Sequence, residues 1–331
     1  MPVSVGVDIG GTKVLAAAVD HTGRVLDTEA TETPGRGAGL ERASVVEVED
    51  ALVDVVNRLL AVHGRCPVGV AAAGFVDKDA QRVRFAPHLP WRDEPLSARL
   101  TERFGHRILG DVLVDNDAAA ALWAEAHYGA AREAYDAIMI TLGTGIGGGL
   151  MVRGRLHRGS NGMAGEYGHM QVVPGGRECQ CGRRGCWEQY CSGRALVRAA
   201  ADGGLELTGT ELTVAAREGD VVARAAYAQV GHWLGVGVAN LVAAIDPPLV
   251  IIGGGVSAAS DLLLPGGRES LAESLVGEGF RDLPELVGAE LGPLAGVVGI
   301  ADLARTAGRI RRVGRWGRAP SRVARGRARR R

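Results

Sequence analysis

Residues 3–32 read VSVGVDIGGTKVLAAAVDHTGRVLDTEATE, and their pattern of apolar residues and glycines indicates the type of fold. Valine or isoleucine at positions 3, 5, 7 and 9 alternates with small or polar residues, which is the two-residue period of a β-strand, and two glycines then interrupt it. LAAAVD and VLDTEATE follow as two further strand segments, separated by the glycine turn HTGR. The stretch therefore predicts a β-hairpin with a third strand.

A second stretch of the chain resembles the first. Residues 141–158, TLGTGIGGGLMVRGRLHR, also run strand, glycine turn, strand and turn. Elsewhere the sequence predicts an amphipathic helix over 41–62, an alanine-rich helix from residue 118, and a long helical stretch over 211–246. The run LVIIGGGVS at 249–257 is predicted as a buried strand that leads into a third glycine turn. Strands interleaved with helices predict an α/β protein with two similar halves.

The length and composition are those of a globular protein of two domains. The chain has 331 residues, of which 46% are hydrophobic and 23% charged, and this composition excludes intrinsic disorder of the whole chain. The longest apolar run, 233–245, is shorter than the roughly 18–20 residues of a membrane span. The amino terminus lacks the pattern of a secretory signal. Three of the five cysteines lie within 179–186, which favours thiols or metal ligands in a reducing compartment. We therefore expect a cytoplasmic protein.

The net charge of zero hides an uneven distribution along the chain. Residues 305–331 contain twelve arginines and no acidic residue, so the preceding 304 residues carry a net charge of −12. We expect the range 307–331 to be a solvated, disordered tail. Alternatively, its arginines bind nucleic acid or another acidic surface by releasing counterions.

The first glycine turn, DIGGTK at residues 8–13, has the chemistry of a phosphate site. Consecutive glycines let backbone N–H groups approach an anion, Thr12 and Lys13 add donors, and Asp8 at the strand end can hold a hydrated magnesium ion. The spacing differs from GxxxxGK[ST] and a strand follows the turn, which excludes a Walker loop. A plain hairpin turn is the alternative interpretation.

The second glycine turn matches GxGxxG at Gly143, Gly145 and Gly148. The segment LMVRGRL after it is typical of a strand, whereas a dinucleotide site requires a helix there, so we do not predict one. Together with the third turn at 253–256, the glycine turns predict phosphate sites on opposite walls of a cleft.

A metal site is predicted by the spacing H-x9-C-x-C-x4-C, formed by His169, Cys179, Cys181 and Cys186. Three thiolates and one imidazole are the ligands of a closed structural zinc site, and the glycines in the loop allow its sharp turns. Buried or reactive thiols are the alternative. Cys191 lies after this motif and is not expected to bind the metal.

Polar side chains with a second possible role lie on either side of this loop. Asn116 and Asp117 stand between a predicted strand and the alanine-rich helix, where either residue can simply be the helix N-cap. Glu166 and His169 are one helical turn apart, and Glu188 follows the cysteine loop. If the metal fixes this loop, these side chains and Asp117 can converge around a hydroxyl-rich ligand.

The motifs taken together resemble the ROK family of sugar kinases, and within it the bacterial glucokinases. The resemblance covers residues 3–306 and runs, in order, through DIGGTK, VDND, LGTGIGGG, EYGH, CQCGRRGCWEQY, IDPPLVIIGGGVS and GVVGIADLA. Several motifs in one order are more specific than any one of them. The chain departs from the family at His88 in APHLPW, where asparagine is expected, and at Cys191, where alanine is expected.

The resemblance implies a duplicated, actin-like (ribonuclease H-like) ATPase fold, with a cleft between two α/β domains. It implies a small domain over 1–118, onto which a helix near 295–306 packs back, and a large domain with the zinc loop over 119–294. It also implies a homodimer or homotetramer.

The implied reaction is phosphorylation of the C6 hydroxyl of a hexose, with glucose as the first candidate and ATP with Mg²⁺ as the phosphate donor. Asp117 would be the catalytic base. The residues that match the sugar-binding positions of the family are Asn116, Asp117, Glu166, His169 and Glu188. Those that match its ATP-binding positions are Asp8, Gly10, Gly11, Thr12, Lys13, Gly143, Thr144, Gly145, Gly254 and Gly255. His169 would have a second role as a ligand of Zn²⁺.

Two alternatives remain. The first is a ROK kinase for N-acetylmannosamine, N-acetylglucosamine or fructose, because sugar specificity depends on small shifts of shared polar groups. The second is a sugar-sensing transcriptional regulator of the same family. Such regulators carry a winged helix-turn-helix before the kinase-like body, and here Asp8 follows the first residue by only seven positions.

Overall fold

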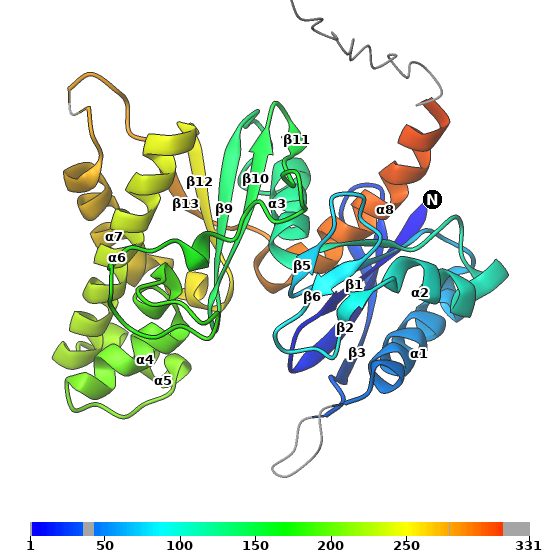
Figure 1. Ribbon diagram of the computed structural model, residues 1–331, viewed down its shortest axis with the longest axis horizontal. Coiled ribbons are helices and arrows are strands. Elements are labelled where there is room, and N and C mark those ends of the chain that lie inside the picture. Colours follow the sequence, from blue (N-terminus) through cyan, green and yellow to red (C-terminus); the bar gives the residue numbers. More distant parts are fainter. Residues whose placement is uncertain (1, 36–42, 278, 314–331) are drawn as a thin grey trace, which may run out of the picture.

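The computed structural model describes residues 2–35, 43–277 and 279–313, and these residues form two five-stranded sheets of the same design (Figure 1). The first sheet has the order β3-β2-β1-β4-β8, with the bounds β1 Val3–Ile9, β2 Lys13–Asp20, β3 Val25–Glu32, β4 Val68–Ala72 and β8 Leu113–Asn116. The second has the order β11-β10-β9-β12-β13, with the bounds β9 Ala137–Leu142, β10 Ile146–Val152, β11 Arg155–Leu156, β12 Leu249–Gly253 and β13 Glu285–Gly288.

Each sheet begins with three antiparallel strands and continues with two parallel ones. Strands β1, β2 and β3 pair antiparallel, and β4 and β8 then add in parallel to β1. Strands β9, β10 and β11 repeat this arrangement, with β12 and β13 added in parallel to β9. The predicted hairpin with a third strand and the predicted internal repeat are both confirmed. The strand β10 directly follows the second glycine turn, as expected, so the context of a dinucleotide site is absent there.

A third, small sheet of β5 (Phe75–Val76), β6 (Val83–Phe85) and β7 (Arg92–Glu94) was not predicted from the sequence. The α-helices are α1 Val45–His63, α2 Leu96–Phe104, α3 Asp117–Tyr128, α4 Gly193–Asp202, α5 Gly209–Glu218, α6 Val221–Ile245, α7 Ser260–Ser274 and α8 Ala295–Val313. Short 3₁₀ turns are η1 Gly105–Arg107, η2 Tyr167–His169, η3 Trp187–Gln189, η4 Gly255–Ala259 and η5 Gly292–Leu294.

Helix α1 covers one face of the first sheet, as its periodicity predicted. Ser44 caps it by accepting the N–H of Glu47, and the Glu47 carboxylate accepts the N–H of Ser44, which completes a capping box. The residues of its apolar stripe that are buried against β1, β2 and β3 include Val48, Leu52, Val55 and Leu59. The predicted first turn, residues 41–42, lies outside the described residues.

The long helical stretch predicted over 211–246 is wrong as a single element, because the structure divides it into α5 and α6. Gly219 ends α5 with a φ of 104°, a conformation that favours glycine, and Asp220 caps α6 by accepting the N–H of Ala223. Among the described helices, α6 alone is long and apolar enough to cross a membrane by composition. Half of that window is buried, and α6 packs against α4, α5 and α7, which is the environment of a core helix.

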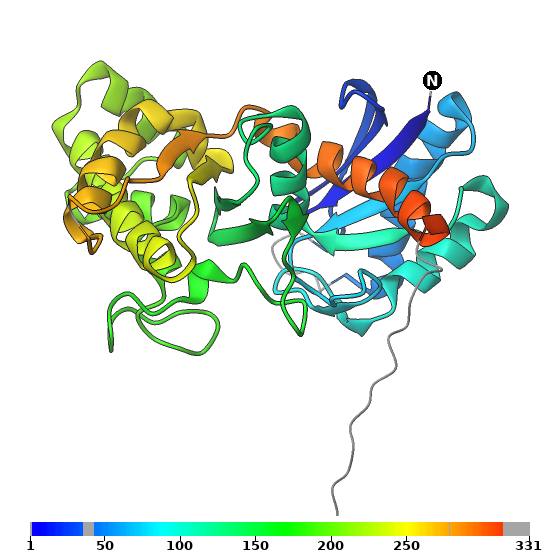
Figure 2. The same ribbon diagram turned by 90° about the horizontal axis from the view of Figure 1, so that it is seen from above.

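Helices α3 and α8 cross between the two halves. Helix α3 contacts β8 and β4 of the first sheet as well as β9 and β10 of the second, and α8 returns to pack on β1 and β4 (Figures 1 and 2). The crossing is very close, because a Cβ atom at Gly299 of α8 would lie 1.8 Å from the carbonyl oxygen of Ala120 in α3. The two helices therefore meet backbone to backbone.

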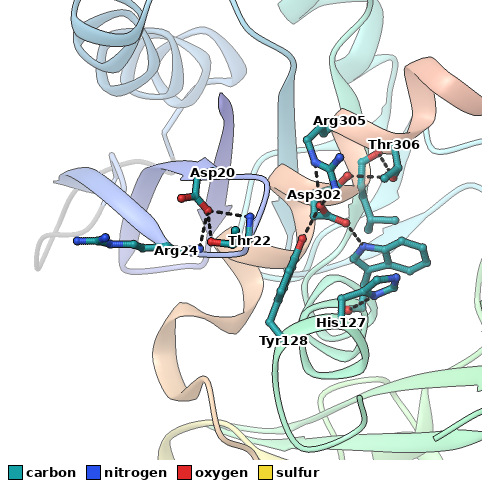
Figure 3. A network of polar contacts seen from close by, with 10 residues as sticks. Asp20, Thr22, Arg24, His127, Tyr128, Asp302, Arg305 and Thr306 are labelled. Carbon is teal, nitrogen blue, oxygen red and sulfur yellow. Dashed lines mark hydrogen bonds and ion pairs between the residues drawn. The ribbon is translucent and has the colours of Figure 1, made fainter. Parts of the chain in front are cut away.

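A network of polar contacts also stabilises the packing of α3 against α8 (Figure 3). The carboxylate of Asp302, 2% exposed, accepts hydrogen bonds from Tyr128 Oη at 2.7 Å and Trp123 Nε1 at 2.9 Å, and pairs with Arg305. Asp20 holds the β2–β3 turn by accepting the N–H groups of Thr22 and Arg24. The ring of Tyr128 lies against Gly23 in that turn. Helix α3 is thus tied to both α8 and the first sheet.

Helix α8 runs to Val313, seven residues into the range predicted as a disordered tail, so residues 307–313 are helical instead. The remainder of that range, residues 314–331, lies outside the described residues. The division of the chain at residue 118 stays a prediction.

Candidate active site

The junction of β8 and α3 presents Asn116 and Asp117. Asn116 is the N-cap of α3: its Oδ1 accepts the N–H of Ala119 at 3.0 Å, and its Nδ2 donates to the carbonyl of Gly74 at 3.1 Å. The capping interpretation is therefore confirmed for Asn116. Asp117 is the first helical residue, and its Oδ1 accepts the N–H of Ala118 at 2.9 Å. The strand and the helix together fix the direction of this carboxylate.

Acidic side chains from both halves gather around Asp117. Burial raises the pKa of Asp117, and this effect outweighs the hydrogen bond from Ala118, which lowers it. Burial and then the charge of Asp117 raise the pKa of Asp8 to about 7. Burial and then the charges of Asp117 and Glu188 raise the pKa of Glu166 to about 7. Carboxylates held this close are typical of a site that binds a cation and transfers a proton.

The structure also brings Glu166, His169 and Glu188 together. His169 Nε2 lies 4.0 Å from Glu166 Oε2, and both side chains are about one third exposed. Glu188 is buried, at 8% exposure, and a Cβ atom at Gly145 would lie 2.5 Å from its Oε2. Glu188 therefore lies directly against the second glycine turn. Carboxylates and an imidazole in this arrangement can accept hydrogen bonds from the hydroxyls of a sugar.

The cysteine loop can hold a metal ion through His169, Cys179, Cys181 and Cys186, whose ligand atoms all lie within 4.8 Å of one another. Cys179 Sγ is 3.8 Å from His169 Nδ1, and Cys181 Sγ is 3.6 Å from Cys186 Sγ. A tetrahedron with zinc–sulfur bonds of about 2.3 Å has edges of about 3.8 Å, so the four groups fit zinc. His169 turns Nδ1 toward this cluster and leaves Nε2 on the side of Glu166. Cys191 lies outside the cluster.

The glycine turns differ in what surrounds them. A Cβ atom at Gly10 or Gly143 would meet nothing within 4 Å, so the backbone of both turns is open to a ligand. Thr12 and Lys13 are exposed at the start of β2. By contrast, Gly148 in the GxGxxG match packs against the ring of Tyr167. Only part of the glycine run is therefore placed to contact a phosphate.

The third turn lies beside the second. Gly254, with a φ of 82°, approaches the backbone of Leu142 at the end of β9, and Gly255 begins η4 with open space around it. Asp8 lies at the end of β1 and faces Gly296 at the start of α8, where a Cβ atom would lie 2.7 Å from Asp8 Oδ2. A divalent cation at Asp8 would offset the burial and the charge of Asp117 that raise its pKa, so its carboxylate fits the Mg²⁺ of a nucleotide.

A cavity of about 1000 Å³ extends from the second and third glycine turns. Its other walls come from α4, α5 and α6, which the sequence analysis did not assign to the site; among them are Gly193, Arg194, Arg198, Thr210, Thr213, Arg217 and Tyr227. Gly193 donates its N–H to the carbonyl of Gly143 at 2.8 Å, and Arg194 Nε donates to that of Thr144 at 2.8 Å. Ser192, a helix-capping residue directly before Gly193 and Arg194, is the one local signal that points to this wall.

Known proteins are similar to this chain over nearly its whole length. A family model described as "ROK family" matches residues 4–307. A glucokinase of Streptomyces coelicolor is 41% identical over 325 residues, which are 92% of this chain and 98% of that protein. A solved structure of a ROK family glucokinase from Streptomyces griseus, in complex with glucose and AMPPNP, is 42% identical with a TM-score of 0.81, over 92% of this chain and 99% of that one. A xylose repressor of Bacillus subtilis is 29% identical over 86% of this chain and 73% of its own length.

Proposed function

The chain belongs to the ROK family, and on this basis we propose that it transfers the γ-phosphoryl group of ATP to the C6 hydroxyl of glucose. Its fold is the actin-like, two-domain fold of the sugar kinases. The observation that carries the proposal is the position of Asp117, a carboxylate at the start of α3 whose charge acts on Asp8 of the first half and on Glu166 of the second.

Asp117 is the catalytic base of the proposal. Its carboxylate accepts the proton of the sugar hydroxyl as the hydroxyl oxygen bonds to the γ-phosphorus, and the bond from that phosphorus to the oxygen of ADP breaks. A raised pKa makes the carboxylate a stronger proton acceptor than an exposed aspartate. A positioned base contributes about 10²–10⁴-fold to the rate.

The sugar lies, in this proposal, between Asp117 and the cysteine loop. Its ring hydroxyls donate hydrogen bonds to the carboxylates of Glu166 and Glu188 and form a hydrogen bond with Nε2 of His169. The side-chain amide of Asn116 adds a contact through the hydrogen-bonding capacity that its capping bonds do not use. The geometry supports these sugar contacts, because Glu166 and His169 face one another and Glu188 lies between the metal cluster and Gly145.

The triphosphate lies along the turns at 10–13 and 143–145, which are open at Gly10 and Gly143, and the adenosine enters the cavity beside Gly254 and Gly255. Mg²⁺ bound with ATP supplies charge neutralisation for the developing negative charge, and Asp8 is the residue that would hold it. The turns exclude water from the reacting phosphate when the two halves close on the sugar.

The metal of the cysteine loop is Zn²⁺ in this proposal, held by His169 and the three cysteines. Its role is to fix the loop, since His169 belongs both to the cluster and to the sugar site, and Glu188 of the sugar site contacts Cys179 of the cluster. We further propose a cytoplasmic homodimer or homotetramer, which light scattering on the purified protein would establish.

The experiment that tests the function measures ADP release with glucose, fructose, N-acetylglucosamine, N-acetylmannosamine and xylose. We expect the highest kcat/KM with glucose, whereas a preference for another hexose would change the substrate, and no turnover with any sugar would contradict the reaction. A regulator would instead bind DNA in a sugar-dependent way without consuming ATP, and a gel-shift on the same preparation distinguishes the two.

A further inference from the structure

A buried ion pair joins the two halves of the chain two residues before Asp117. Asp115 lies in β8 with its side chain 2% exposed, and its partner Arg158 follows β11 with its side chain 26% exposed. Arg158 Nε lies 3.1 Å from both oxygens of the carboxylate, and Arg158 Nη2 donates to Oδ2 as well. The Oδ1 atom also accepts the N–H of Asn116 at 3.0 Å. The carboxylate is therefore held by a bidentate guanidinium and by the backbone of the sugar site.

The loop that carries Arg158 also carries Glu166. The N–H of Ala164 donates to the carbonyl of Arg158 at 3.0 Å, so the loop closes on itself. At its tip, Gly162 rests on the backbone of residues 76–78 beside β5, where a Cβ atom would lie 2.0 Å from the carbonyl oxygen of Val76. The loop is thus attached to the first half at two points, although it follows strands of the second half.

The end of the loop returns to the second half. Gly165 lies against the carbonyl oxygen of Gly148 in β10, and the next residue is Glu166. Glu166 therefore stands at the end of a loop that is attached to both halves of the chain.

We propose that Arg158 is a positioning residue for the sugar site: its ion pair with Asp115 holds Glu166 at a fixed distance from Asp117. The inference rests on the proposed function, because it assigns Glu166 and Asp117 to one substrate. Arg158 acts through the loop and touches neither the reacting atoms nor the nucleotide cavity, whose lining does not include it. Loss of the Arg158 side chain should therefore change the kinetic constants for the sugar far more than those for ATP.

The test compares Arg158→Lys, Arg158→Met and Asp115→Asn with Arg155→Met, which removes a nearby exposed arginine. We expect Arg158→Met and Asp115→Asn to lose about 100-fold in kcat/KM for glucose, since displacement of a positioning group by about 1 Å has effects of this size. Lysine keeps the positive charge but cannot form the bidentate pair of the guanidinium. Arg158→Lys should therefore have a kcat/KM for glucose of about a tenth of the wild-type value. The KM for ATP should stay within about 2-fold of wild type, and Arg155→Met should match wild type in both substrates.

A purely structural role predicts a different pattern. Equal losses for glucose and ATP that follow the loss of thermal stability, or a wild-type KM for glucose in Arg158→Met, would overturn the inference. Hydrogen exchange gives a readout independent of catalysis: in Arg158→Met the backbone of residues 158–166 should exchange at least about 10-fold faster, while α1 remains unchanged.

The two proposals fail separately. If the wild-type protein phosphorylates no sugar, the proposed function fails, and the exchange rates of residues 158–166 still decide whether Arg158 fixes the loop. If the wild type phosphorylates glucose and the Arg158 variants do so equally well, only the positioning role is wrong.

Discussion

The phenolic oxygen of Tyr128 donates a 2.7 Å hydrogen bond to Oδ1 of Asp302, and this bond joins the last turn of α3 to α8 (Figure 3). Helix α3 begins with Asp117, and α8 begins beside Asp8. The contact therefore stabilises the packing of α3, which presents Asp117 at its first residue, against α8, whose first turn lies beside Asp8 of β1.

Replacing Tyr128 with phenylalanine should lower the free energy of unfolding by about 1–2 kcal/mol, because the buried carboxylate of Asp302 loses one of its donors. Tyr135→Phe is the control, since Tyr135 is 65% exposed and its change should stay within about 0.5 kcal/mol. Denaturant unfolding of both variants measures the difference. Equal stabilities would show that Trp123 and Arg305 alone satisfy Asp302.

Replacing Asp117 with asparagine should lower kcat by about 10²–10⁴-fold, because the amide cannot accept the proton of the sugar hydroxyl. Binding of glucose, followed by calorimetry, should persist, since the shape of the site is unchanged. Asp79→Asn is a matched control, because Asp79 is exposed and pairs with Lys78 on the surface. Full activity of Asp117→Asn would disprove the assignment of the base.

The stability of the ligand-free protein should depend on pH through Asp8, whose folded-state pKa is raised from 3.8 to about 7. Well below pH 3.8 the carboxyl group is protonated in both states and does not change the stability. As the pH rises to 7, the unfolded chain loses this proton while the folded protein retains it, so the stability contributed by this group falls and stays low above pH 7. Asp8→Asn removes the penalty.

We expect Asp8→Asn to be more stable than wild type at pH 8 by at most about 4 kcal/mol, and equally stable near pH 4. The exposed Asp54→Asn variant should show no such pH-dependent difference. Thermal unfolding without Mg²⁺ or nucleotide, across pH 4–8, makes the comparison. A wild-type stability for Asp8→Asn at pH 8 would contradict the burial effect.

Purified protein should contain one zinc ion per chain, measured by elemental analysis, and Cys181→Ser should lose it. Because His169 and Glu188 belong to the same loop, the metal-free variant should show a KM for glucose raised by about 10–100-fold. Cys191→Ala should keep its zinc, since Cys191 is buried outside the cluster. Zinc retained in Cys181→Ser, or lost in Cys191→Ala, would point to a different ligand set.

Local sequence patterns predicted the elements whose cause is local. The two-residue alternation of β1, the spacing of the stripe in α1, and the short spacing of the cysteines each depend on residues near one another in the chain. The break between α5 and α6 is also local, but a single Gly219 within an apolar helical pattern is a weak signal.

The remainder of the site depends on contacts between residues far apart in the chain, which hydrophobic periodicity does not reveal. Asp115 and Arg158 are 43 positions apart, and although Asp115 lies in the motif VDND, no sequence pattern pairs it with Arg158. The wall of the cavity on α4 and α5 is likewise brought to Gly143 by packing. Family resemblance supplied the proposed roles of Asp117 and Glu166 because the motif order is long-range information that the single chain does not otherwise provide.

Gly299 has a consequence that reaches beyond helix packing. One turn away from it along α8 is the backbone that faces Asp8, and one turn away from its neighbour Ala120 along α3 is Asp117. A side chain as small as a methyl group at residue 299 would push the two helices apart and increase the distance between the carboxylates of Asp8 and Asp117. The separation of the proposed Mg²⁺ ligand from the proposed proton acceptor thus depends on the absence of a Cβ atom one helical turn away.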